Sequence, residues 1–300
     1  MSIKNLLIAT VGLLSLSACS SDEAMPEKSS QGQVPIILGS SLDGATTRSA
    51  TNIQNNRFDV STIVDVQIEA TATGDRTRYD LLQYQVADAS GTLTPVKKVY
   101  PYYPVSGSSV NIYAVYPTGN LDGESFTVKT SQLNKDNYKA SDLIFGKVED
   151  QMAQQAVVTI PFRHLLSKVI VNLEAGDNGE DIDGSIVNLL GVATKIALEG
   201  RGELGNADES SRTTVNMSTD GSMSSAAIIV PQEVPSGVLI EVLLKNNDIV
   251  NYKTTQTMIF ESGKKYTFNI KVVEEKLVAT CSVEPWDSYN DTDLDQTIKL

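Results

Sequence analysis

His164 is the only histidine in this 300-residue chain, so histidine-based chemistry has almost nothing to work with. A serine triad needs an imidazole base, and a histidine-rich metal cluster needs several imidazoles. A single histidine cannot form a histidine cluster, and the sequence shows no serine triad around it. His164 lies between two stretches that alternate apolar and polar residues. A structural role is therefore predicted for it.

Acidic side chains gather in two places, and calcium binding is the chemistry that such clusters bring to mind. Residues 177–184 read DNGEDIDG, and four aspartates follow in the tail, namely Asp287, Asp291, Asp293 and Asp295. An EF-hand loop has twelve residues and ends on a glutamate ligand, and neither stretch has that spacing. No pattern pairs two carboxylates for glycoside hydrolysis. We predict solvated acidic loops, with no catalytic residue and no metal.

Cys19 is the position with a definite chemistry. Lys4 precedes a short apolar run, Leu6–Leu16, and small residues follow, which is typical of a secretory signal. Residues 16–19 read LSAC and look like a bacterial lipobox, in which the signal is cut before the cysteine and the thiol carries a diacylglycerol. We predict a signal peptide over residues 1–18, cleavage between Ala18 and Cys19, and a covalent lipid on Cys19 as the one attached group. An ordinary signal peptide with an incidental cysteine is the alternative.

The segment after Cys19 indicates where the protein goes. Residues 20–23 read SSDE and resemble the acidic signal that sends some lipoproteins to the outer face of the outer membrane. Residues 19–33 are rich in Ser, Glu, Gln and Pro and predict a flexible tether. The expected location is therefore the cell surface, held at the outer membrane by the lipid. A net charge of −13 disfavours nucleic acid as a partner.

The centre of the chain predicts two domains. Residues 157–173 read as two alternating strands joined by a short hinge near His164. Alternation places every second side chain on one face, so each strand can line a core of its own. A chain of 300 residues is long enough for two cores. We predict an N-terminal β-sandwich over residues 34–164 and a C-terminal β-sandwich over residues 165–300.

Short alternating runs separated by turn residues predict an all-β protein. In the first half the expected strands are residues 34–39, 64–70, 82–86, 110–116, 126–128 and 157–162. In the second half they are residues 169–173, 194–198, 213–217, 227–230, 238–244, 252–258, 266–272 and 277–283. Residues 132–140 predict a single helical turn, and Cys281 is expected to be a small buried residue. Residues 100–104, YPYYP, predict a packed loop.

Two central motifs resemble those of a known family. Residues 142–146 (DLIFG) and 160–169 (IPFRHLLSKV) are similar to the signature of the fimbrillins, which are type V pilus subunits and related lipoproteins of anaerobic Gram-negative bacteria. Other similar elements are residues 114–117 (AVYP), 229–232 (IVPQ), 263–268 (GKKYTF) and 285–286 (PW). The resemblance spans the whole chain. It implies two tandem transthyretin-like β-sandwiches, export as a lipoprotein and assembly by strand exchange.

The resemblance also gives a meaning to residues 45–49, ATTRS, which look like the family's maturation site. There an arginine-specific protease would cut between Arg48 and Ser49. Small polar neighbours favour an accessible backbone, although an ordinary solvated arginine is the alternative. Cutting would release residues 19–48 with the strand at 34–39. A strand of a neighbouring subunit could fill the groove left behind, with residues 277–283 or 297–300 as the expected donor.

The sequence thus predicts a structural pilin with no enzymatic activity, which polymerises with other pilin subunits into an adhesive surface filament. A host or bacterial surface receptor would be its further partner. The alternative is a surface lipoprotein of the same fold that stays monomeric and binds a host or dietary glycan. A hydrolase on a β-sandwich is a third class, for which the sequence lacks the residues.

Overall fold

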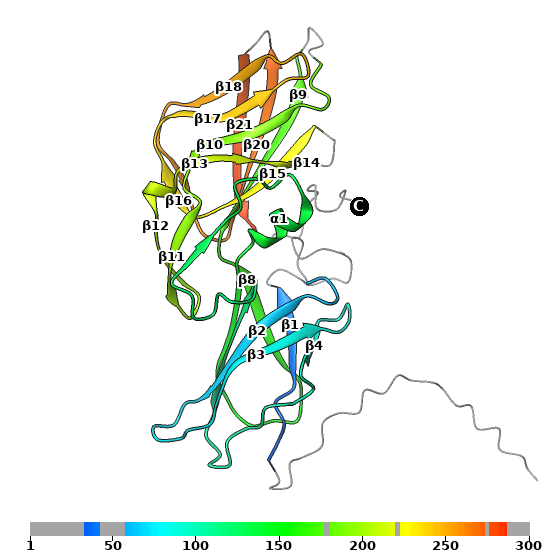
Figure 1. Ribbon diagram of the computed structural model, residues 1–300, viewed down its shortest axis with the longest axis vertical. Helices are drawn as coiled ribbons and strands as arrows, with labels where there is room; N and C mark the ends of the chain where they lie inside the picture. The colour runs from blue at the N-terminus through cyan, green and yellow to red at the C-terminus, as the bar shows by residue number, and fades with distance from the viewer. Residues whose placement is uncertain (1–32, 43–57, 177–180, 220–222, 274–275, 287–300) are drawn as a thin grey trace, which may run out of the picture.

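The computed structural model describes residues 33–42, 58–176, 181–219, 223–273 and 276–286. Strands dominate this part of the chain, and α1 (Lys135–Ala140) is its one α-helix. The prediction of an all-β protein is confirmed. Figure 1 shows an elongated molecule, with the early strands in one half and the later strands in the other. Within the described residues, no helix has the length and apolar character needed to cross a membrane.

The early strands close into a barrel in the order β1–β4–β3–β2–β5–β7–β8. They are β1 (Leu38–Leu42), β2 (Ile63–Ala70), β3 (Arg78–Val86), β4 (Thr92–Pro95), β5 (Val110–Tyr116), β7 (Ile144–Gln151) and β8 (Val158–His164). Neighbouring strands are antiparallel except for β1 and β8, which are parallel. A closed ring of pairing therefore stands where two open sheets were predicted, and it leaves no strand edge unpaired.

The barrel forms because its strands alternate as the sequence indicated. In β8, Val158, Ile160 and Phe162 are buried, whereas the residues between them are exposed. Phe162 packs edge to face against Phe58, with ring centroids 4.8 Å apart. Together with apolar residues of the other strands these side chains form one continuous core inside the barrel. Removing that apolar surface from water is the main force that closes the ring.

The later strands form two facing sheets with a second core between them. The four-stranded sheet has the order β13–β10–β17–β18, with β10 (Ile186–Val192), β13 (Thr213–Asn216), β17 (Gly237–Leu243) and β18 (Ile249–Thr254). The five-stranded sheet has the order β14–β15–β9–β20–β21, with β9 (Ser167–Ala175), β14 (Ser218–Thr219), β15 (Ser224–Ile229), β20 (Lys264–Val273) and β21 (Lys276–Pro285). Val171, Leu189, Ile240 and Phe268 bring both sheets into one core. Such packing is that of a β-sandwich, while its transthyretin-like character stays a prediction.

A third core joins the two halves and includes buried residues from both. Strand β6 (Ser125–Thr127) pairs with β11 (Lys195–Gly200), which pairs with β12 (Glu203–Ala207). The Gln132 amide donates to the Ile228 carbonyl at 2.7 Å and accepts from the Ile228 N–H at 2.9 Å. Residues that precede the predicted boundary at 164/165 therefore bind the second half, and α1 lies at the junction in Figure 1.

The connection between the halves is a bonded corner where a hinge was expected. Only Leu165 and Leu166 separate β8 from β9, and both are buried. The Leu165 N–H donates to the Leu143 carbonyl at 2.9 Å, and the Leu165 carbonyl accepts from the Ser262 hydroxyl at 2.7 Å. The Gly263 N–H donates to the Leu166 carbonyl at 2.9 Å. These hydrogen bonds tie the backbone of the corner to residues distant in the sequence, so they restrain rotation of one half against the other.

Several local expectations are refined by the structure. The first strand begins at Leu38 and not at residue 34. The single strand expected at residues 252–258 is two pieces, β18 and β19 (Met258–Phe260), and β19 pairs with β16 (Gln232–Val234). The predicted helical turn is α1, capped by the Asn134 side chain. The prediction that Cys281 is buried is wrong, because β21 is an edge strand and this cysteine is exposed.

Candidate functional site

Strand β1 is the element that closes the barrel. It lies between β4 and β8, as Figure 1 shows. On one side Leu38 is paired with Leu93 of β4, and on the other Leu38 to Leu42 run parallel to Val158 to Phe162 of β8. The Val158 N–H donates to the Ile37 carbonyl at 2.8 Å. Without β1, both β4 and β8 would have a free edge.

The residues just before β1 extend the same pairing. The Ile36 N–H donates to the Pro101 carbonyl at 2.8 Å, and the Tyr103 N–H donates to the Val34 carbonyl at 2.9 Å. An isolated antiparallel bridge joins Pro35 to Tyr102 between these bonds. The expected packing role of this tyrosine-rich loop agrees with its position, since Tyr103 is buried in the barrel core. The whole run from residue 34 to residue 42 is thus inserted into the wall of the barrel.

Side chains hold this run in place from the inside. Ile36, Leu38 and Leu42 belong to the barrel core and are at most 2% exposed. Burying an aliphatic side chain of this size contributes about 1.5–3 kcal/mol, so the three together stabilise the closed barrel by roughly 5–9 kcal/mol. A segment that fills the same place would need apolar residues at the same alternate positions.

Outside the core, one close approach fixes the register of β1 against the turn before β4. The Ser40 N–H and hydroxyl both donate to the Gly91 carbonyl, at 2.8 and 3.0 Å. Gly91 has a φ of +87°, and a Cβ at this position would stand 2.4 Å from the Ser40 carbonyl oxygen. Only glycine allows the two backbones to come this close.

The positions predicted for processing lie outside the described residues. These are Ala18 and Cys19 at the signal cleavage and lipid site, and Arg48 and Ser49 at the maturation site. Leu42 and Phe58 are the described residues on either side of the maturation site. Cleavage and lipidation therefore stay predictions, whereas the strand that cleavage would release is seen in place.

The chain's only histidine lies in a buried cluster at the corner between the halves. His164 Nδ1 is 3.0 Å from an Asp142 carboxylate oxygen, and both side chains are almost fully buried. The His164 ring stacks on the Trp286 indole, with centroids 4.0 Å apart and planes 9° apart. The backbone N–H of Trp286 donates to the Gly263 carbonyl at 2.9 Å. These contacts fit a structural histidine that fastens the end of β21 to the barrel.

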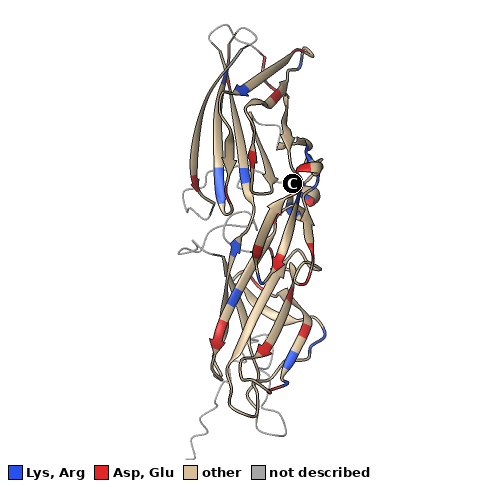
Figure 2. Ribbon diagram, turned by 90° about the vertical axis from the view of Figure 1, so that its left-hand side faces the viewer, with Lys and Arg blue, Asp and Glu red and all other residues tan. Residues whose placement is uncertain are grey.

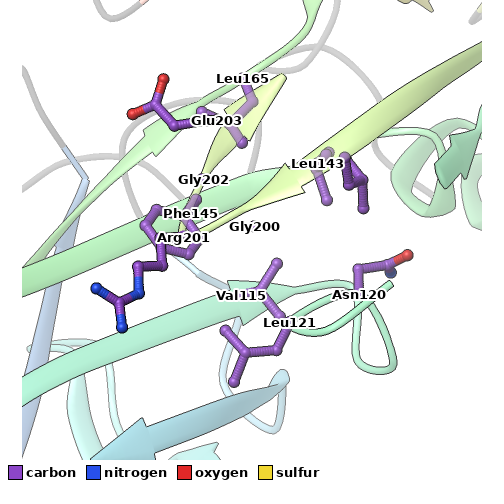
Figure 3. Close-up of a pocket in the computed structure, with 11 residues that line it drawn as sticks. Val115, Asn120, Leu121, Leu143, Phe145, Leu165, Gly200, Arg201, Gly202 and Glu203 are labelled. Carbon is purple, nitrogen blue, oxygen red and sulfur yellow. The ribbon is translucent and has the colours of Figure 1, made fainter. Parts of the chain in front are cut away.

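A small pocket lies beside this corner, between β5, β7 and the turn of the β11–β12 hairpin (Figure 3). Its volume is about 10 Å³, which holds about one water molecule and excludes any larger ligand. Val115, Leu121 and Phe145 make its walls largely apolar. The pocket is a packing gap between the two halves. Its lining residues do not bring catalytic side chains together.

The described residues hold no group of three or more His, Cys, Asp or Glu side chains arranged for a metal ion. Of the acidic loop considered above, Asp181 and Asp183 are described, and an Asp181 carboxylate oxygen lies 3.5 Å from the Lys245 ammonium. Figure 2 shows Lys and Arg interspersed with Asp and Glu along the strands of both halves on that face.

Sequence reasoning missed how the first strand is used. The apolar run at residues 34–39 was recognised as a strand, but its parallel partner, β8, lies 120 residues away in the numbering. Parallel pairing over such a distance leaves no local pattern in either strand. Gly91 was also missed, although a glycine in a turn between two predicted strands is a usable signal for a close backbone approach.

Comparison with known proteins identifies a matching family. A family model for fimbrillin-like proteins matches residues 47–286. No curated protein matches the chain.

Solved structures share the fold. A candidate cell adhesion protein from Bacteroides uniformis has 19% identity and a TM-score of 0.65, over 84% of this chain and 98% of that one. One from Bacteroides ovatus has 20% identity and a TM-score of 0.68, over 85% and 98%. The tip fimbrial protein Mfa3 from Porphyromonas gingivalis, truncated at its C-terminus, has 7% identity and a TM-score of 0.53, over 85% and 100%.

Proposed function

Because the chain belongs to the fimbrillin-like family, we propose that it is a structural pilin that polymerises by protease-triggered strand exchange into an adhesive filament on the cell surface. Proteins of this family are structural and not enzymatic, and association with other fimbrial subunits is what the family supports. The finer steps of export, cleavage and exchange are the content of the proposal.

One observation carries the proposal, namely that β1 is inserted between β4 and β8 and closes the barrel. Its loss would free main-chain groups on both neighbours and uncover the places of Ile36, Leu38 and Leu42 in the core. A strand from another subunit would restore both kinds of contact: hydrogen bonds supply affinity, and alternate side chains fill pockets. The uncut strand competes at high effective concentration, so the precursor stays monomeric.

The donor strand comes from the C-terminal region in this proposal. The two candidate segments were residues 277–283 and residues 297–300. The first lies within β21, which pairs with β20 from Lys276 to Pro285. Donating it would break that pairing. Residues 297–300 lie outside the described residues, and we propose them as the donor because their use would leave β21 paired with β20.

Export as a lipoprotein precedes assembly. Cys19 would carry the lipid, palmitate among its acyl chains, and hold the precursor at the outer membrane until a protease cuts between Arg48 and Ser49. Each buried acyl methylene adds about 0.8 kcal/mol to membrane binding, so an anchor with three chains holds stably. Cutting removes lipid and β1 in one step, which couples release from the membrane to readiness for polymerisation.

Immunogold electron microscopy of native cells tests the proposal, with a strain lacking the chain as the matched control. Gold along surface filaments, and an N-terminus at Ser49 in protein extracted from those filaments, are the expected results. Filaments without label, or filament protein that still contains residues 34–42, would contradict it.

A further inference from the structure

A groove of about 650 Å³ runs between the outer wall of the barrel and the β11–β12 hairpin. Residues of β2, β3 and β5 form its floor, the loop after β5 forms one wall and the hairpin turn forms the other. It is separate from β1 and from the seam that β1 fills, because none of its lining residues belongs to β1, β4 or β8. A groove of this size is large enough for a short peptide segment or a small ligand.

Arg201, at the tip of the hairpin, already places a cation in this groove. Its guanidinium nitrogen is 2.9 Å from a Glu69 carboxylate oxygen, and its guanidinium carbon lies 5.1 Å from the centre of the Tyr113 ring. A carboxylate and an aromatic face are the two groups that attract a cation most directly. Figure 3 shows Arg201 projecting from the hairpin turn, away from Leu143 and Asn120.

The backbone at this tip is held in an unusual conformation. Gly200, Arg201 and Gly202 have φ values of 84°, 51° and 81°, so an arginine lies in the left-handed region between two glycines. A Cβ on Gly202 would stand 2.3 Å from the Phe145 ring. Non-glycine residues in this region cost free energy and recur at functional sites. The tip is therefore built to present the Arg201 side chain, which is 64% exposed, toward the barrel.

Four carboxylates of the groove remain available to a ligand. Asp122 and Glu124 lie on one wall and Glu199 and Glu203 on the other, all four are exposed, and none forms an ion pair with another described residue. The second arginine of the groove, Arg78, is already paired, because its Nε is 2.6 Å from an Asp80 carboxylate oxygen and another of its guanidinium nitrogens is 3.8 Å from a Glu69 carboxylate oxygen. The groove thus has an excess of negative charge.

An unpartnered group on the floor points to a ligand as well. Tyr113 lines the groove and is 1% exposed, and its buried hydroxyl has no hydrogen-bond partner in the described structure. A buried hydroxyl without a partner is destabilising, and a ligand group that hydrogen-bonds to it would relieve that cost. Arg201 lies over this ring, so a ligand that displaced Arg201 would gain access to it.

We propose that this groove binds a ligand with several alkylammonium or guanidinium groups, and that Arg201 is a built-in cation that such a ligand displaces. Two sources share this chemistry, namely a lysine- or arginine-bearing segment of a partner protein and a free polyamine. One cation of the ligand would take the place of Arg201 between Glu69 and Tyr113, and the others would pair with the carboxylates on the two walls. This site is independent of strand exchange, so its test and the test of the proposed filament can fail separately.

Binding of a fluorescent tetralysine peptide and of spermine to the full-length precursor tests the proposal, at low and at high salt. Glu199→Gln with Glu203→Gln should weaken binding about three- to tenfold, which corresponds to two exposed ion pairs. Asp183→Asn with Glu233→Gln is the matched control, because it removes the same charge from exposed positions outside the groove. Thermal unfolding checks that each variant is folded, and Asp122→Asn with Glu124→Gln repeats the test on the opposite wall.

Arg201→Ala separates a displaced cation from a merely structural one. Removal of the competing guanidinium should strengthen binding about two- to fivefold, although the variant loses an ion pair between the halves. Tighter binding of tetralysine than of spermine would assign the site to a protein segment, and the reverse would assign it to a polyamine. Equal affinities of the groove variant and its matched control, or weaker binding by Arg201→Ala, would overturn the proposal.

Discussion

Leu38→Ala should weaken the protein more than any other single change in the first strand. Leu38 is fully buried, and it lies where β1 is paired on both sides, opposite Leu93 and Val158. Its side chain belongs to the barrel core, so truncation leaves a cavity beneath the one strand that closes the ring. The surrounding strands are paired on both edges and can relax little into that space.

The expected loss follows from the burial. Leucine-to-alanine changes in well-packed cores lower the free energy of unfolding by roughly 2–5 kcal/mol. A typical domain is stable by only about 5–15 kcal/mol, so this change removes a large share. Ser41→Ala is the matched control on the same strand, because Ser41 is only partly buried and is not a member of the barrel core. It should change stability by no more than about 0.5 kcal/mol.

Urea unfolding of the uncut precursor measures the difference. With a urea dependence of about 1–3 kcal/mol per molar, Leu38→Ala should lower the midpoint by about 1 M or more, while Ser41→Ala leaves it unchanged. The same variant should lose β1 faster after the chain is cut, since the strand is held less tightly. If Leu38→Ala and Ser41→Ala unfold at the same urea concentration, β1 does not hold the barrel closed and the reasoning fails.

Three further outcomes are expected. Trp286→Ala should cost about 3–5 kcal/mol in urea unfolding, because the indole is 1% exposed and stacked on His164, and exposed Val283→Ala should cost little. Burial raises the pKa of Tyr116 to about 12, above the value near 10 expected in the unfolded chain. Because the folded state favours the neutral phenol, Tyr116 contributes stability that is present below pH 10 and is lost as the pH rises toward 12. Melting temperatures should therefore fall over that range, and Tyr116→Phe should flatten the fall. Cys19→Ser should abolish palmitate labelling and membrane retention, and labelled Cys19→Ser protein would remove the lipid anchor from the account.

Much of the fold follows from local patterns in the sequence. The alternation in β8, with Val158, Ile160 and Phe162 inward, predicts both the strand and its buried face. The same holds for β20 and β2, whose lengths and positions agree closely with the expected runs. Strand existence depends on nearest neighbours in the chain, and that information is present in a single sequence.

Closure and burial depend on partners far away in the chain, and there the predictions failed. In β2, Asp65 and Gln67 alternate with apolar residues, a pattern that predicts a half-buried strand with its polar side chains facing water, yet both are buried. Asp65 accepts a hydrogen bond from the Gly119 N–H at 2.6 Å, because the loop after β5 folds over this face of the barrel. Cys281 shows the opposite case, an apolar-looking position on an edge strand that is exposed within the described part of the chain. The sequence of a strand does not show whether another element packs over its outer face.

The candidate site shows the same difference between local and long-range information. The presence of a first strand and an arginine soon after it can be read directly from residues 34–48. That this strand closes a barrel by pairing in parallel with β8 cannot be read there, because the pairing is set by the packing of the whole ring. The groove beneath Arg201 was likewise out of reach, since it forms only where Glu69 and Tyr113 of the barrel meet a hairpin of the other half.

Mass by light scattering, followed while an arginine-specific protease acts on the purified chain, tests the central claim most directly. We predict that the precursor is monomeric, that mass grows after cutting, and that the released fragment ends at Arg48. Arg48→Ala should block both the release of that fragment and the growth, while the other arginines remain as internal controls for the protease. If Arg48→Ala polymerises as the unchanged chain does, or if the cut chain stays monomeric, removal of β1 does not drive assembly.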